Sequence, residues 1–250
     1  MSYSSTSVSE QLRHYAKCYE TARFLVGDPS WFMHQVSGVA NQEAMAFVAA
    51  SLSYGSRKQF LPKIQVIMDA AGGQVDAWLR SGRFLQMFRA DDASSFYRLY
   101  THAAMHAFLS TYARLLAECG TLGAYVKAHA CDGYGAVEAI TSYFRQYGSG
   151  GVIPKDATSA CKRICMFLRW MVRSDSPVDL GLWADFIDRR TLLMPLDTHV
   201  LQEAQRLGLV SSRTASMTAC KKLTACLAEI FPSDPLAGDF ALFGYGVDAP

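Results

Sequence analysis

Apolar residues recur three and four positions apart along almost the whole chain, which is the spacing of amphipathic helices around a core. Alternating runs bounded by turns, which would indicate strands, are missing. The chain is therefore predicted to be all-α. The predicted helices span about 8–26, 41–53, 57–71, 74–80, 92–117, 121–128, 134–147, 157–173, 178–187, 198–208, 213–231 and 235–244.

Composition and charge indicate a folded globular protein but do not indicate which ligand it binds. Half of the residues are hydrophobic and 18% are charged, which is typical of a folded core and excludes a disordered chain. The net charge is +2, so any affinity for a polyanion depends on where Arg and Lys lie. Seven scattered cysteines, an odd number, favour reduced thiols in a cytoplasm over a disulfide framework.

Targeting segments are not expected. The start of the chain has neither the basic nor the apolar stretch of a signal peptide, and no apolar run approaches the length of a membrane span. No repeat of fixed period occurs, and the glycine-rich stretch 148–151 is the best internal boundary.

The segment "LMPLDTHVLQEA" (193–204) places one acidic residue at the start of a predicted helix. Pro195 keeps the preceding residue extended and helical spacing follows, so Asp197 is predicted to be the N-cap. Leu196 and Leu201 have the spacing of a hydrophobic staple around that cap. Capping without any chemistry is a complete explanation of these residues taken alone.

The segment "SACKRICMFLRW" (159–170) places one lysine beside an apolar helix face. Asp156, Thr158 or Ser159 is expected to cap this helix, which puts Lys162 in its first turns. The positive end of a helix disfavours a protonated amine, so a partly buried lysine there is easier to deprotonate. The alternative is a lysine that keeps its charge in water. Met166, Arg169 and Arg173 are expected along the same border of the helix.

Together the two residues suggest a chemistry. A neutral amine can attack an electrophilic carbon while a carboxylate stabilises positive charge or moves protons. The spacing of Lys162 and Asp197 in the sequence leaves open whether they meet.

Both segments resemble the helix-hairpin-helix superfamily of DNA glycosylases, the group of endonuclease III and the 8-oxoguanine glycosylases. "CKRIC" (161–165) aligns with the superfamily segment in which a lysine opens the helix after the hairpin. "LDTHV" (196–200) aligns with the start of the helix that an aspartate caps. With "AASLSYGSRKQ" (49–59) and "DFALFGYG" (239–246), the chain looks more closely like an uncharacterised bacterial family related to those glycosylases.

The resemblance implies a fold and an activity. The fold is a two-lobed helical bundle of the glycosylase type, with a first lobe over about 1–148, a second over about 149–250, and the N-terminal helix packed on the second. The activity is base-excision repair of double-stranded DNA, in which a damaged base, an oxidised base among the candidates, is flipped out. Lys162 is then the nucleophile that attacks the sugar C1′. The Schiff base that Lys162 forms would give the protein abasic-site lyase activity, while Asp197 stabilises the cationic sugar. Such a protein acts in the cytoplasm, at the nucleoid.

The resemblance also implies residues that contact DNA. Tyr54 is the candidate wedge for the gap left by a flipped base, with Arg57 and Lys58 near the phosphates. The other candidates are Thr158, Ser159, Ala160, Arg163 and His199. Thr158, Ser159 and Ala160 stand where the superfamily has a "G-V-G" turn, so the grip of this hairpin on phosphate is in question.

Several other features bear on the function. A groove lined by basic residues is expected from Arg57, Lys58, Lys63, Lys162, Arg163, Arg169, Arg173, Lys221 and Lys222. Trp170, Phe96, Tyr97 and Trp183 are candidates to stack on a base or to belong to the core. Only two cysteines follow Asp197, so no iron–sulfur cluster or other cofactor is expected, and no set of residues has metal-ligand spacing.

Two other functions stay open at this point. One is a DNA-binding protein that has kept the fold and lost the chemistry, as the altered hairpin allows. The other is a helical interaction module without a nucleic-acid role, as the near-neutral charge allows.

Overall fold

The computed structural model describes residues 7–248. It is mostly helical, as predicted. The α-helices are α1 (Val8–Tyr19), α2 (Val39–Leu52), α3 (Arg57–Ala70), α4 (Val75–Arg80), α5 (His102–Cys119), α6 (Leu122–His129), α7 (Gly133–Tyr147), α8 (Lys162–Val172), α9 (Thr198–Arg206), α10 (Met217–Ile230) and α11 (Ala237–Asp248). Short 3-10 helices are η1 (Ala22–Leu25), η2 (Pro29–His34), η3 (Arg83–Gln86) and η4 (Arg189–Thr191), and two strands, β1 (Ser95–Tyr97) and β2 (Tyr100–Thr101), form a hairpin.

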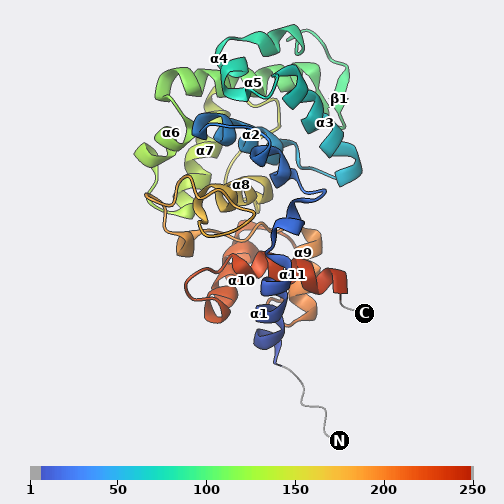
Figure 1. Ribbon diagram of the computed structural model, residues 1–250, viewed down its shortest axis with the longest axis vertical. Coiled ribbons are helices and arrows are strands. Elements are labelled where there is room, and N and C mark those ends of the chain that lie inside the picture. Colours follow the sequence, from blue (N-terminus) through green and yellow to red (C-terminus); the bar gives the residue numbers. More distant parts are fainter. Residues whose placement is uncertain (1–6, 249–250) are drawn as a thin grey trace, which may run out of the picture.

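The helices gather in two groups (Figure 1). Helices α2 to α7 form the upper group, and α9 to α11 form the lower group together with α1. The first helix therefore lies with the last, because α1 packs along α11. Helix α8 lies between the groups, in contact with α2 above it and bonded through its side chains to α11 below.

Helix α2 is the centre of the upper group and is buried on nearly all sides, as expected for a helix that is apolar all round. Its one acidic residue, Glu43, is 4% exposed. The Glu43 carboxylate accepts hydrogen bonds from the N–H groups of Leu122 (2.8 Å) and Gly123 (3.0 Å) at the start of α6, and from Trp183 Nε1 (2.9 Å). Burial raises the pKa of Glu43 despite these three donors. Glu43 thus fastens α6 and the segment around Trp183 to the core.

Three predicted helices begin or end five or more residues from the predicted bound. The helix predicted over 8–26 ends at Tyr19, and a short 3-10 helix follows. The helix predicted over 92–117 begins at His102, because Ser95–Thr101 pairs as an antiparallel hairpin, so the expectation of no strands is wrong here. The helix predicted over 157–173 begins at Lys162, because Cys161 has a left-handed backbone (φ 45°) that a helix cannot pass through.

The helix predicted over 178–187 does not form. Backbone N–H groups of this segment donate to the last turn of α8, among them Leu180 to the Trp170 carbonyl (2.7 Å) and Trp183 to the Met171 carbonyl (2.7 Å). The bonds within the segment, such as Ala184 N–H to the Gly181 carbonyl (3.2 Å), form turns and no helix. The segment therefore satisfies the free carbonyl groups at a helix end, which is an alternative to forming a helix of its own.

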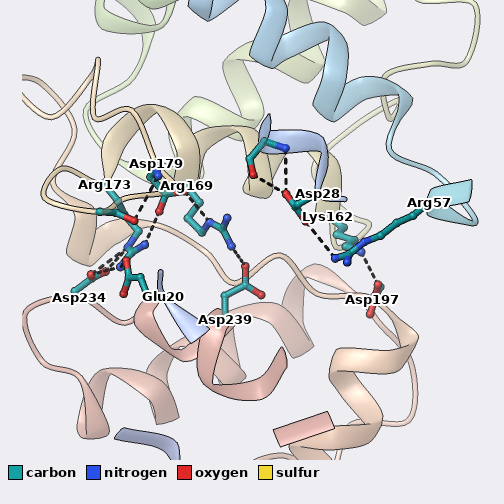
Figure 2. Close-up of polar contacts among 12 residues, drawn as sticks. Glu20, Asp28, Arg57, Lys162, Arg169, Arg173, Asp179, Asp197, Asp234 and Asp239 are labelled. Atoms are coloured by element: carbon teal, nitrogen blue, oxygen red, sulfur yellow. Dashed lines mark hydrogen bonds and ion pairs between the residues drawn. The ribbon is translucent and has the colours of Figure 1, made fainter. Parts of the chain in front are cut away.

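Helix α8 is held by a buried ion cluster made of Arg169, Arg173, Glu20, Asp179, Asp234 and Asp239 (Figure 2). The prediction that Arg169 and Arg173 line an open border or groove is wrong, because their side chains are only 4% and 2% exposed. Arg173 binds Glu20 (2.7 Å), Asp234 (2.7 Å) and Asp179. Arg169 binds Asp179 (3.2 Å) and Asp239.

We predict that Arg173→Met lowers the free energy of unfolding by about 3–5 kcal/mol, because removing one partner leaves buried carboxylates without their counter-charge. Urea unfolding followed by circular dichroism measures the change. The matched control is Arg190→Met, which breaks an exposed ion pair with Asp188; the Arg190 side chain is 66% exposed. That control is expected to stay within about 0.5 kcal/mol of the wild type. Equal small effects of both variants would contradict a stabilising role of the cluster.

Candidate functional site

Lys162 and Asp197 meet. The Lys162 Nζ atom lies 2.5 Å from Asp197 Oδ2, although the two residues belong to different helices (Figure 2). Lys162 is the first residue of α8, as the resemblance implied, and Asp197 directly precedes α9. Their side chains are 38% and 35% exposed. The pair is thus held in place by the fold and is still reachable from solvent.

The carboxylate of Asp197 has two tasks. Its Oδ1 atom accepts the backbone N–H of Val200 (2.9 Å), which confirms the prediction that Asp197 is the N-cap of α9. Leu196 and Leu201, the predicted staple pair, are both buried on either side of the cap. Since the cap uses one oxygen, the other is aimed at Lys162. Burial is the largest influence on the pKa of Asp197 and raises it, but the Lys162 charge, the Lys162 hydrogen bond and the Val200 N–H together outweigh burial and lower that pKa.

The start of α8 differs from the predicted one. None of Asp156, Thr158 and Ser159 caps the helix; the N-cap is Cys161, whose side chain makes no capping hydrogen bond. Asp156 instead accepts the N–H of Thr158 (3.0 Å), and Ser159 pairs with Ser216 ahead of α10. Lys162 therefore opens the helix directly after a residue in the left-handed conformation, Cys161.

The turn before α8 is poorly arranged to bind phosphate. Thr158 and Ser159 are exposed, while Ala160 is buried. The N–H of Thr158 is already bonded to the Asp156 carboxylate (3.0 Å). The pKa of Asp156 is lowered by its hydrogen bonds to Thr158, so this carboxylate stays charged near neutral pH and opposes an anion at the same place.

The candidate DNA contacts of the upper group lie around the end of α2. Tyr54 is 40% exposed, and Lys58 is exposed in the first turn of α3. Arg57 binds Asp28 (3.1 Å) and lies over the Phe243 ring (5.4 Å), so part of its charge is neutralised. Arg163 is half-buried and donates to the Tyr100 hydroxyl (2.6 Å) and to the carbonyl of Ser51.

His199 stands on the exposed side of α9 next to the pair. Its side chain is 67% exposed, with Nδ1 3.9 Å from Glu203 Oε1. A protonated His199 lowers the pKa of Asp197. Within residues 7–248, no group of three or more His, Cys, Asp or Glu side chains is placed to hold a metal ion.

Four aromatic residues that were candidates to stack on a base belong to the core. Phe96, Tyr97, Trp170 and Trp183 are each 5% exposed or less. All seven cysteines are free thiols; Cys161, Cys165 and Cys220 are buried, whereas Cys18 and Cys131 are exposed.

Sequence reasoning missed Asp239 near the pair. Asp239 on α11 binds Arg169, and its pKa is raised because burial outweighs the Arg169 charge. It also lies within the electrostatic reach of Lys162 and Asp197. The available signal was a lone acidic residue in the apolar stretch "DFALFGYG". The site is thus more acidic than its two predicted members indicate.

Comparison with known proteins gives one match. Residues 28–248 match the family described as "Protein of unknown function (DUF2400)". No curated protein and no solved structure matches the chain. Among the described residues, no helix is both long and apolar enough to cross a membrane.

We predict that Asp197→Asn removes an acid-sensitive part of the stability. Because the folded-state pKa of Asp197 lies below the usual 3.8, the ionised carboxylate stabilises the fold above that value and loses this effect as the pH falls through the folded-state pKa. Urea unfolding from about pH 6 down to about pH 2.5 should show a wild-type advantage that disappears at the acid end. Asn is an equally good N-cap, so the difference isolates the charge and stays below about 1 kcal/mol at this exposure. A difference that does not change with pH would contradict the assignment.

Proposed function

The chain belongs to the DUF2400 family, whose description names no activity, and we propose that this protein is a base-excision DNA glycosylase with abasic-site lyase activity. One observation carries the proposal: an accessible lysine and an aspartate from two helices lie in direct contact, each in a position fixed by its helix start. The similarity of both segments to the glycosylase superfamily supports the same conclusion.

Lys162 supplies the nucleophile in this proposal. Its amine, once it has lost a proton, attacks the sugar C1′, and the bond from C1′ to the base breaks with its electron pair leaving on the base. The base takes up a proton, and the attacking nitrogen releases one. Opening of the sugar ring then gives a Schiff base between Lys162 and C1′, from which the strand is cleaved by elimination.

Asp197 supplies charge. A carboxylate with a lowered pKa is a weak proton acceptor at neutral pH, so its main task is to remain ionised and stabilise the positive charge that develops on the sugar. Because the cap fixes one of its oxygens on Val200 N–H, the other keeps its direction without rearranging during the reaction.

A DNA-binding protein without the chemistry is the second candidate. The hydrogen bond between Asp156 and the Thr158 N–H favours this second candidate. The turn before α8 then lacks the phosphate contact that the active glycosylases make with their hairpin, which indicates divergence from those enzymes. The two candidates differ in whether a covalent intermediate forms.

We predict that borohydride traps the wild-type protein on a duplex that carries an abasic site, because hydride reduces the Schiff base to a stable amine. Lys162→Gln is expected to lose at least about 99% of the adduct, and Asp197→Asn to form it about 10²-fold more slowly, in line with loss of one charge-stabilising group. Adduct is measured on denaturing gels with labelled duplexes carrying an abasic site, 8-oxoguanine or an oxidised pyrimidine.

The matched control is Lys127→Gln. Lys127 also pairs with an aspartate, Asp185, at 2.9 Å, but on an exposed surface, so its loss should leave trapping unchanged. Salt-dependent DNA binding with no adduct on any duplex would reject the lyase mechanism and leave the silent DNA-binding protein. Absence of DNA binding would reject both and leave an interaction module.

A further inference from the structure

Two of the seven cysteines are exposed, and their surroundings differ. Cys18 lies in the last turn of α1, and Cys131 lies between α6 and α7. An exposed thiol alone indicates no function, because its reactivity depends on the groups around it. A comparison of these two thiols therefore separates the effect of exposure from the effect of the environment.

Cys18 has a histidine one helical turn before it. The Cys18 Sγ atom lies 3.5 Å from His14 Nε2, which is hydrogen-bond distance for sulfur, and both side chains are exposed on one face of α1. A nucleophile with a base within hydrogen-bond reach is the arrangement that activates a thiol. Within residues 7–248, Cys131 has no hydrogen bond to a histidine.

Cys18 also lines a cavity of about 520 Å³ whose charged residues are both cations. They are Arg23, in η1, and Arg57, the first residue of α3. Arg57 is partly neutralised by Asp28, whereas Arg23 forms no ion pair within residues 7–248. The cavity therefore has room for a small molecule and suits one that carries negative charge.

The two cations offset an unfavourable position of the thiol. The C-terminal end of a helix disfavours negative charge, and Cys18 lies in the last turn of α1. Arg23 and Arg57 share the cavity with the sulfur and favour the thiolate. A nucleophile, a base and two cations thus meet at one cavity.

We propose that Cys18 is a modification site, at which a small, negatively charged disulfide such as glutathione disulfide forms a mixed disulfide with the protein. His14 Nε2 takes the thiol proton, and the Cys18 thiolate attacks one sulfur of the disulfide. A bond forms between these two sulfurs and the original S–S bond breaks. The departing glutathione takes the electron pair and then the proton from His14, so Cys18 is oxidised and one glutathione leaves reduced.

The test measures the rate at which glutathione disulfide modifies each cysteine of the full chain, by mass spectrometry of the protein and its peptides. Cys18 is expected to react at least about tenfold faster than Cys131, and His14→Ala to slow Cys18 about tenfold or more, in line with loss of a general base. Cys131 is the matched thiol, because it is also exposed and lines a cavity of about 500 Å³, but with Asp185 and Asp188 in its wall.

Arg23→Gln tests the charge of the ligand. This variant is expected to slow the reaction with glutathione disulfide about threefold, the size of one exposed charge contact, and to leave the reaction with the uncharged disulfide dithiodipyridine unchanged. His14→Ala is expected to slow both. An equal effect of Arg23→Gln on the two disulfides would overturn the preference for an anion.

Two other results would overturn the modification site itself. One is an equal rate at Cys18 and Cys131, and the other is a Cys18 rate that His14→Ala does not change. Both variants alter exposed side chains, so their circular dichroism spectra are expected to match that of the wild type.

One consequence of the adduct rests on the proposed function. The adduct places negative charge beside Arg57, a candidate DNA contact, so the modified protein is expected to bind duplex DNA about threefold or more weakly until dithiothreitol removes the adduct. Unchanged binding of the fully modified protein would overturn this consequence. A reduced wild type without salt-dependent DNA binding would reject the proposed function and leave the reaction of Cys18 standing.

Discussion

The position of the candidate site depends on two buried arginines, Arg169 and Arg173, at the C-terminal end of α8. Each buried guanidinium costs several kcal/mol unless it is fully paired, and the four carboxylates that pair with Arg169 and Arg173 come from three separate parts of the chain. Glu20 follows α1, Asp179 lies in the segment after α8, Asp234 precedes α11 and Asp239 lies within α11. The pairing is complete only when all four are in place, so it fixes α8 in one orientation. Lys162, at the other end of the same helix, is then held against Asp197.

The same arrangement places an excess of negative charge at the C-terminal end of α8, and one of its carboxylates, Asp239, lies within the electrostatic reach of the Lys162 amine. Two guanidinium groups face four carboxylates, and burial raises the pKa of both Asp179 and Asp239. Asp197 is different, because it is partly exposed and has Lys162 and a backbone N–H as donors, so its pKa is lowered. The fold thus keeps one carboxylate ionised at the surface next to the amine, and holds harder-to-ionise acids behind it.

The sequence was sufficient wherever local rules decide the structure. Helical periodicity predicted most helices to within a few residues, and the Asp197 cap followed from Pro195 and the apolar spacing around it. It was insufficient where distant parts compete for the same groups. The segment over 178–187 has a helical pattern, but the N–H groups of Leu180 and Trp183 bind the end of α8. Arg169 and Arg173 have the spacing of a solvent border, but their partners lie far away in the sequence. For the same reason, Lys162 and Asp197 could each be identified as candidates, whereas their contact and the nearby Asp239 required the tertiary structure.

The contact between α1 and α11 also bears on how the protein folds during synthesis. Helix α1 leaves the ribosome before the other described helices, but α11, the helix it packs against, is made after them, and Glu20 must likewise wait for Arg173. The upper group can assemble while translation continues, since its helices are neighbours in the sequence. The lower group cannot close until α11 has left the ribosome. Its assembly is therefore the late step, during which the apolar face of α1 is exposed to chaperones and to aggregation.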